Sequence, residues 1–432
     1  MKRSTALSTL LRTPLRAALG VFVFGCALLA AAIAWQLRAD ALPPVSSVPA
    51  ASAEQLERGA YLARAGNCMA CHTARGGQPY AGGRFIDTPF GRVVAGNLTP
   101  DAQTGLGLWS PQAFRRALHE GRSRDGRLLV PAFPYTHTTL LRDDDVDALY
   151  AHLRQLPPVQ QAQPAHALRF PYNTQAALAL WQLLQFQPQR FVPDAARTAE
   201  WNRGAYLVNG LAHCAACHGS RDPMGGLRQA FGAAEMPDGR WFAPSLRDPA
   251  QGGLQHWPTE RIVALLRDGT VADGPGHATV MGPMAEVVFD STQHLRADDL
   301  RAVAVYLQDL PVQAEPVPEV EPAAPAQMDL GQRIYKQHCA DCHGAQGQGA
   351  TGAYPPLAGN RAVLMASPVN TVQAIVSGGF APATVGHPQP YGMPPFRTLL
   401  SPAEIAAVAS YVRQSWGNRA GAVSSLDVQR VQ

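Results

Sequence analysis

Apolar residues recur along the chain at the spacing of helices that bury one face. Two kinds of apolar segment each occur three times, with positions three or four residues apart. The shorter kind ends in a glycine, a common helix stop, and comprises Phe114, Ala117 and Leu118 before Gly121, Ile262, Leu265 and Leu266 before Gly269, and Val372, Ile375 and Val376 before Gly378. The longer kind comprises Val146, Leu149 and Leu153, Leu300, Val303 and Leu307, and Ile405, Val408 and Val412. The sequence therefore predicts three copies of one helical unit.

The residues at the start of the longer helices are typical of helix N-termini. Asp143 to Asp145 and Asp298-Asp299 place negative charge where the helix dipole favours it. Ser401-Pro402-Ala403-Glu404 has the form of a capping box with proline in the first turn. An earlier short helix is indicated in each copy by Arg58-Gly59-Ala60-Tyr61-Leu62, by Arg203-Gly204-Ala205-Tyr206-Leu207, and by Gly331 with Tyr335. No alternating strand pattern competes, so we predict an all-α fold.

An uncharged apolar run from Ala17 to Trp35 follows the basic residues Lys2, Arg3, Arg12 and Arg16. As a helix it would be about 28 Å long, close to the thickness of the hydrocarbon layer. The basic flank predicts a cytoplasmic N-terminus with the rest of the chain outside. We expect residues 1–40 to form an N-terminal transmembrane anchor. A signal segment cleaved at Ala39-Asp40-Ala41 and a lipoprotein box at Val23 to Cys26 stay open as alternatives.

Length and composition favour three small domains. We predict domains at 54–157, 197–311 and 328–418, followed by a tail at 419–432. The stretch 312–327 is rich in proline and should be an extended linker, and Pro43 to Ala53 should join the anchor to the first domain. Residues 158–196 should instead pack, on the domains or on a partner subunit, through Phe170, Tyr172, Trp181, Leu183, Leu184, Phe186 and Phe191. A net charge of +4 without a run of Lys and Arg excludes a nucleic-acid partner.

Six of the seven cysteines form three identical motifs, one at the head of each copy. They are Cys68-Met69-Ala70-Cys71-His72, Cys214-Ala215-Ala216-Cys217-His218 and Cys339-Ala340-Asp341-Cys342-His343. C-x-x-C-H is the attachment motif of c-type haem, in which two thiols bind the porphyrin and the histidine binds its iron. A zinc site or a thioredoxin-like redox site would not require the histidine. We therefore predict three covalent haem c groups, with His72, His218 and His343 as iron ligands.

Methionines supply the second iron ligand in two copies. Met393, in Tyr391-Gly392-Met393-Pro394, lies between the middle and closing helices of the third copy. The second copy offers Met284 and Met281, of which we favour Met284. The first copy has Phe133 at the corresponding position, and no methionine lies between Met69 and Met224. His137 is the nearest substitute ligand, which would lower the potential of that haem. His119 on the middle helix and an open iron are the alternatives.

The sequence resembles the three-haem cytochrome c subunits of bacterial membrane-bound alcohol, gluconate and sorbitol dehydrogenases and of molybdenum hydroxylases. The resemblance covers residues 54 to about 427 and rests on Asn97-Leu98-Thr99-Pro100-Asp101, Thr104-Gly105-Leu106-Gly107, Trp109-Ser110, Trp201 to Leu207, Gly282 to Val288, and Ser415-Trp416-Gly417-Asn418. The Ala132-Phe133-Pro134-Tyr135 loop is closer to the subset serving molybdenum hydroxylases such as aldehyde or nicotinate dehydrogenase. The resemblance implies three class I cytochrome c domains.

The resemblance also implies a function. The chain would not be an enzyme by itself but the electron-transfer subunit of an oxidoreductase complex. A catalytic dehydrogenase subunit with molybdenum and iron-sulfur centres, or with flavin, would supply electrons, and ubiquinone or a terminal acceptor would receive them. The haem domains would face the periplasm at the inner membrane, held in the lipid by the N-terminal helix. Two other classes stay open, namely a haem peroxidase or small-molecule reductase with an open iron in the first domain, and a cytochrome c subunit of a terminal oxidase.

Overall fold

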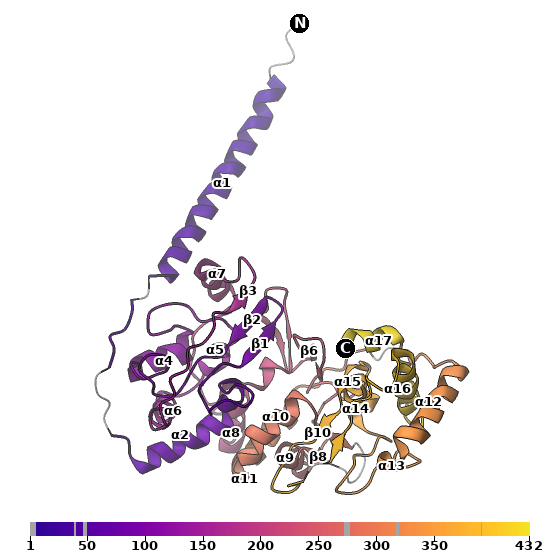
Figure 1. Cartoon of the computed structure of the whole chain (residues 1–432). Helices are drawn as coiled ribbons and strands as arrows, with labels where there is room; N and C mark the ends of the chain where they lie inside the picture. Colours follow the sequence, from indigo (N-terminus) through magenta and orange to yellow (C-terminus); the bar gives the residue numbers. More distant parts are fainter. Residues whose placement is uncertain (1–5, 39, 46–49, 272–276, 317–318, 390) are drawn as a thin grey trace.

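The computed structural model describes residues 6–38, 40–45, 50–271, 277–316, 319–389 and 391–432, without the side chains of residues 6–16. α1 (Ala6–Gln36) projects from one end of a body made of the three copies (Figure 1). Its part Ala17–Gln36 is long and apolar enough to cross a membrane, a property that signal sequences share. Lys2 and Arg3 lie outside the described residues, as do parts of the predicted linkers at 46–49 and 317–318.

The first and last helices of each copy pack against each other: α2 (Ala53–Ala65) on α6 (Asp143–Arg154), α8 (Ala199–Tyr206) on α11 (Ala297–Gln308), and α12 (Pro325–His338) on α16 (Pro402–Gln414). A glycine lies at each crossing. A Cβ atom on Gly59, Gly204 or Gly331 would lie 1.9, 2.0 or 2.2 Å from a carbonyl oxygen of the opposing helix. The repeated glycine therefore allows the two backbones to approach closely.

The middle helices are α4 (Pro111–Glu120), α9 (Thr259–Asp268) and α15 (Val369–Ser377). Each is followed by the predicted glycine, with φ of 63° at Gly121, 76° at Gly269 and 61° at Gly378. The predicted capping box of α16 is also present, since the Ser401 hydroxyl accepts from the Glu404 N–H while the Glu404 carboxylate accepts from the Ser401 N–H. The sequence signals for helix ends are thus confirmed at these positions.

The structure describes further helices besides these. They are α3 (Cys68–Cys71), α5 (Tyr135–Thr138), α7 (Gln175–Gln185), the π-helix η1 (Leu207–Leu211), the 3-10 helices η2 (Cys214–Ala216) and η3 (Thr292–His294), α10 (Pro283–Asp290), α13 (Ala340–His343), α14 (Arg361–Leu364) and α17 (Ser425–Val431). The predicted linker at 158–196 contains α7 and lies on the body. There the ring of Phe186 packs 4.9 Å from that of Tyr135, and Phe191 packs 5.4 Å from Tyr206.

The prediction of an all-α fold is incomplete, because short antiparallel strands form between the helices. A three-stranded sheet has the order β1-β2-β3, and the other strands pair two by two. The strands are β1 (Phe85–Thr88), β2 (Gly91–Val94), β3 (Ala167–Leu168), β4 (Gly219–Arg221), β5 (Leu227–Ala230), β6 (Ala234–Glu235), β7 (Phe242–Ala243), β8 (Thr270–Val271), β9 (Ala278–Thr279), β10 (Gly379–Phe380) and β11 (Gly392–Met393). None exceeds four residues, too few for an alternating pattern to stand out.

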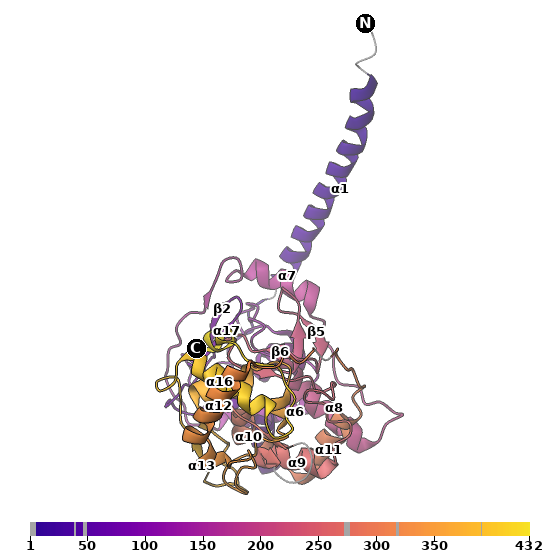
Figure 2. The ribbon, with the colours of Figure 1, turned by 90° about the vertical axis from the view of Figure 1, so that its right-hand side faces the viewer.

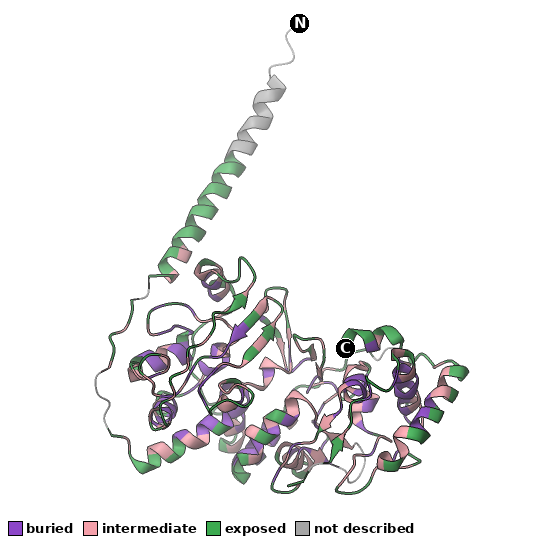
Figure 3. Cartoon of the chain, viewed as in Figure 1, coloured by how far each residue is buried: buried purple, intermediate pink, exposed green. Residues whose placement is uncertain are grey.

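Buried residues occur along the helices of all three copies (Figure 3). Their apolar side chains form two main cores. One continuous core joins the first two copies, for it includes both Leu149 of α6 and Leu307 of α11. The third copy has a core of its own, around Ile405 of α16. This second core also contains Val428 of α17, so the predicted C-terminal tail includes a packed helix. The first two copies thus fold around shared apolar contacts, whereas the third buries its apolar residues separately.

Two tyrosines connect the first and second copies reciprocally. The Tyr61 hydroxyl donates to Asp299 of the second copy, and the Tyr206 hydroxyl donates to Asp145 of the first at 2.6 Å. In the third copy the matching Tyr335 donates to the carbonyl of Gly344 in the same copy. The pairing of the first two copies is therefore polar as well as apolar.

Candidate haem sites

Each C-x-x-C-H motif follows the first helical segment of its copy, which in the second copy is α8 continued by η1. The residue before the first cysteine has a left-handed backbone in two copies, with φ of 52° at Asn67 and 39° at His213. This sharp change of direction ends the helical segment and starts the short turn that carries the two cysteines. None of the six cysteines forms a disulfide. Local backbone geometry thus places two thiols and a histidine together three times.

The three motif histidines are held in the same way. Nδ1 of the imidazole contacts a backbone carbonyl in each copy, namely His72 with Gly96 at 2.7 Å, His218 with Pro244 at 2.8 Å, and His343 with Pro355 at 3.0 Å. A carbonyl can only accept, so Nδ1 carries the proton and Nε2 keeps its lone pair. Burial lowers the pKa of all three imidazoles. Each histidine therefore has the neutral form and the free nitrogen that bind iron.

The loop that supplies this carbonyl is built alike in all copies, a feature not recognised in the sequence. Two residues after the acceptor comes a leucine whose N–H donates to a residue with positive φ. The pairs are Leu98 with Tyr80 (φ 61°), Leu246 with Phe231 (φ 61°), and Leu357 with Gly347 (φ 64°). Only the recurring leucine two residues after Gly96, Pro244 and Pro355 could have indicated these positions.

The first cysteine of each motif lies in surroundings that disfavour the thiolate form. Burial raises the pKa of Cys68 and Cys214 to about 12 and that of Cys339 to about 11, so these thiols are neutral. Among the residues that the structure describes, no three His, Cys, Asp or Glu side chains converge as a zinc site would require. Two thiols beside an imidazole with a free Nε2 instead fit a covalently bound haem.

The methionines proposed as second ligands lie in different settings. Met393, in β11, packs on the core that also contacts Cys339. Met284, in the first turn of α10, packs with Val280 and Val288. Met281 lies at the boundary with the third copy, since its Cε is 3.6 Å from a Cβ built on Gly379. In the first copy, Phe133 packs on the core that Cys68 also contacts.

His137, in α5, lies where the first and second copies meet. It is 8% exposed, and its Nδ1 contacts the carbonyl of Asn209 in η1 at 2.9 Å. Its ring centre is 6.4 Å from that of His213, the residue before Cys214. Like the motif histidines, His137 is thus an imidazole whose Nδ1 is held by a carbonyl, and it is more deeply buried than they are. Its role as an iron ligand stays a prediction.

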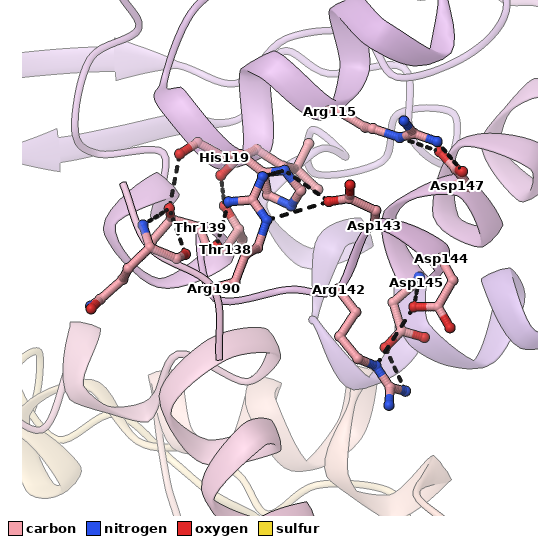
Figure 4. Close-up of polar contacts among 12 residues, drawn as sticks. Arg115, His119, Thr138, Thr139, Arg142, Asp143, Asp144, Asp145, Asp147 and Arg190 are labelled. Carbon is pink, nitrogen blue, oxygen red and sulfur yellow. Dashed lines mark hydrogen bonds and ion pairs between the residues drawn. The ribbon is translucent and has the colours of Figure 1, made fainter. Parts of the chain in front are cut away.

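His119, the alternative ligand, belongs to a polar cluster on α4 (Figure 4). The side chain is 2% exposed, and its Nδ1 contacts the guanidinium of Arg190 and lies 3.7 Å from Asp143. Burial and the positive charge of Arg190 lower the pKa of His119 to about 4. These contacts show that Nδ1 of His119 is engaged by the residues that join α4, α6 and the segment after α7.

Known proteins resemble this chain along most of its length. The family model "Cytochrome c" matches residues 56–157, 202–311 and 328–416. A nicotinate dehydrogenase subunit of Pseudomonas putida is 40% identical over 91% of this chain, and the chain spans only 33% of that protein. The cytochrome c subunit of alcohol dehydrogenase (quinone) from Gluconobacter oxydans is 37% identical, covering 87% of this chain and 82% of the relative. The gluconate 2-dehydrogenase cytochrome c subunit of Pantoea cypripedii is 34% identical, covering 86% and 88%.

The relatives confirm the resemblance of the sequence to cytochrome c subunits of bacterial dehydrogenases. The three matched segments each contain one C-x-x-C-H motif. Since they also cover well over half of the residues, this chain belongs to the cytochrome c family.

Proposed function

We propose that the chain is an electron-transfer subunit that carries three haem c groups and passes electrons from a periplasmic dehydrogenase to ubiquinone or a terminal acceptor. The observation that carries the proposal is the threefold repetition of one arrangement, in which a neutral histidine beside two free thiols has its Nδ1 fixed by a carbonyl. One such arrangement in each copy fits electron transfer between equivalent sites.

Each copy contributes its own set of residues to the proposed sites. The thiols of Cys68, Cys71, Cys214, Cys217, Cys339 and Cys342 would attach the porphyrins. His72, His218 and His343 would bind the irons on one side. Met284 and Met393 would bind on the other side in the second and third copies, and His137 in the first. When bound, haem supplies an iron that gains and loses one electron reversibly.

Contacts between copies support an order of sites with the second in the middle. The Arg84 guanidinium donates to the carbonyl of Ala70, in the first motif, at 2.8 Å and to Glu286 of α10 at 2.7 Å. This bridge joins the first motif to the helix that carries Met284. On the other side, Met281 adjoins Gly379, whose strand β10 pairs with Met393. The three candidate sites are thus linked from the first to the second and from the second to the third.

The electron donor would be a dehydrogenase, because the relatives are named as subunits of nicotinate, alcohol and gluconate dehydrogenases. We favour a molybdenum hydroxylase with iron-sulfur centres over a flavin dehydrogenase as this donor. The reason is the Ala132 to Tyr135 loop, which has Phe133 where subunits of the alcohol dehydrogenase type usually have a methionine. α1 would hold the subunit in the inner membrane. Purification of the chain with its catalytic partner, followed by reduction of the haems with that partner's substrate, tests the donor.

Variants of the thiols and ligands test the sites. Cys339→Ala with Cys342→Ala should lower the intact mass by one haem, whereas Cys26→Ala, in α1, should leave the haem content unchanged. Met284→Ala should convert one low-spin haem to a high-spin form that binds carbon monoxide, and Met281→Ala should not. His137→Ala should do the same for the first haem. An unchanged spectrum would exclude His137 as a ligand.

A further inference from the structure

The body of the protein is docked onto the end of α1. Ile33 packs with Leu128, Leu178 and Ala179, of which the last two lie on α7. The Gln36 side chain donates to that of Gln182 at 2.9 Å, and the carbonyl of Gln36 accepts from Arg122. Figures 1 and 2 show α7 at the end of the body from which α1 projects. α7 therefore lies beside the point where the apolar part of α1 ends.

The outer surface around α7 is apolar. Phe170 is 82% exposed and Leu184 60%, and Leu183 and Tyr172 are exposed as well. No charged residue occurs from Phe170 to Gln189. The outer face of a helix in contact with water normally carries charged residues, and exposed apolar groups gathered in one place mark an interaction surface. The interior side of α7 is already filled, since Leu178, Ala179 and Gln182 are buried.

The location of the exposed α7 face, beside the end of α1, indicates what it contacts. Trp35, at the end of α1, is exposed. The Arg38 guanidinium lies 5.8 Å from the centre of the Trp35 ring. Trp and Arg at the end of an apolar helix are typical of the membrane–water boundary. α7 is docked at this same level of α1. An uncharged helix with exposed leucines at that level matches an interfacial helix.

We propose that α7 and the neighbouring Phe170 rest on the outer surface of the lipid bilayer that α1 spans. This inference rests on the proposed membrane insertion of α1. Two attachments, α1 in the bilayer and α7 on its surface, would fix the orientation of the first copy relative to the membrane. Because the α7 face carries no charge, its attachment would arise from apolar burial and would not require anionic lipid.

Photochemical crosslinking in membranes that hold the full haem-loaded chain tests the proposal. A benzophenone-bearing residue would replace Leu184, Leu28 in α1, or Val385, which is 95% exposed in the third copy. Light should add the mass of one phospholipid to the chains altered at 184 and at 28, and should leave the chain altered at 385 without lipid.

A protein adduct at 184, or no adduct there, would overturn the proposal. If lipid were nevertheless captured at position 28, the membrane insertion of α1 would be supported, and only the contact of α7 with the bilayer would be excluded. Without capture at 28, both would fail. The haem content and spectrum of the same samples report separately on the proposed electron-transfer function.

Discussion

At the scale of single residues, the junction between the first two copies depends on buried carboxylates with several donors. Asp299 accepts from Arg203 at 2.7 Å and from the Tyr61 hydroxyl across the junction. Burial alone would raise its pKa, but the hydrogen bonds from Arg203 and Tyr61 and the charges of Arg203 and Arg296 outweigh burial and lower it. The third copy has Leu330 where the other two have Arg58 and Arg203, so this arrangement is confined to the paired copies.

The lowered pKa of Asp299 makes the junction sensitive to acid. A carboxylate with a lowered folded-state pKa contributes stability above the ordinary value of about 4, and this contribution is lost as the pH falls through the lowered value. Asp299→Asn should therefore destabilise the chain by about 1–3 kcal/mol at pH 7, and by less below pH 4. Denaturant unfolding at both pH values measures this. Asp298→Asn, at an exposed neighbour, is the control. An equal loss at both pH values would contradict the argument.

The lowered pKa of His119 predicts a second pH dependence of stability, at higher pH than that of Asp299. His119 is neutral in the folded chain because its pKa is about 4, whereas an unfolded histidine takes up a proton below about pH 6.5. Stability should thus fall as the pH decreases from about 6.5 to 4, by on the order of 3 kcal/mol. His119→Gln should reduce this slope in unfolding free energy but leave the part due to other buried histidines such as His137, whose pKa burial also lowers to about 4. His256→Gln, at an exposed position, should leave the slope unchanged. An undiminished slope in His119→Gln would contradict the argument.

At the scale of helices and strands, the sequence was informative where structure is local. Helix ends such as Gly121 and Ser401 were predicted correctly because caps depend on residues within one turn. The carbonyl of Gly96 that holds His72 could not be predicted, because 24 residues separate the two. The bond from Tyr61 to Asp299 spans 238 residues and joins two copies. The short strands were missed because they form within loops and have no pattern of their own.

The glycines at the helix crossings provide a test at this scale. Gly204→Ala would place Cβ 2.0 Å from the Ala302 oxygen, so α8 and α11 must separate. We expect a loss of about 1–3 kcal/mol in the free energy of unfolding. Gly421→Ala adds a Cβ with no atom within 4 Å and should change stability by less than about 0.5 kcal/mol. If both variants unfold alike, the close crossing does not depend on the glycine.

At the scale of the whole molecule, the three copies form two units. The first two copies share a core and the reciprocal tyrosine bonds, whereas the third has a separate core that α17 completes. Contacts between the second and third copies include hydrogen bonds, such as that from the Arg361 guanidinium to the carbonyl of Pro249 at 2.6 Å, and the apolar contact of Met281 with Gly379, but the apolar cores of the two copies are separate. A pair of sites held rigidly together would keep their separation constant, while the third could respond to a partner bound beside it.

Hydrogen exchange can distinguish two units from three. Segments that share a core open together, so Gly204→Ala should raise exchange in α2 and α6 of the first copy as well as in the second. The equivalent change in the third copy, Gly331→Ala, should raise exchange only within residues 325–431, because its Cβ meets Ala407 and Tyr411 of that copy. Mass spectrometry of peptides from each copy makes the comparison within one sample. If α2 and α6 kept their protection in Gly204→Ala, the first two copies would open independently, and the shared core would not couple them.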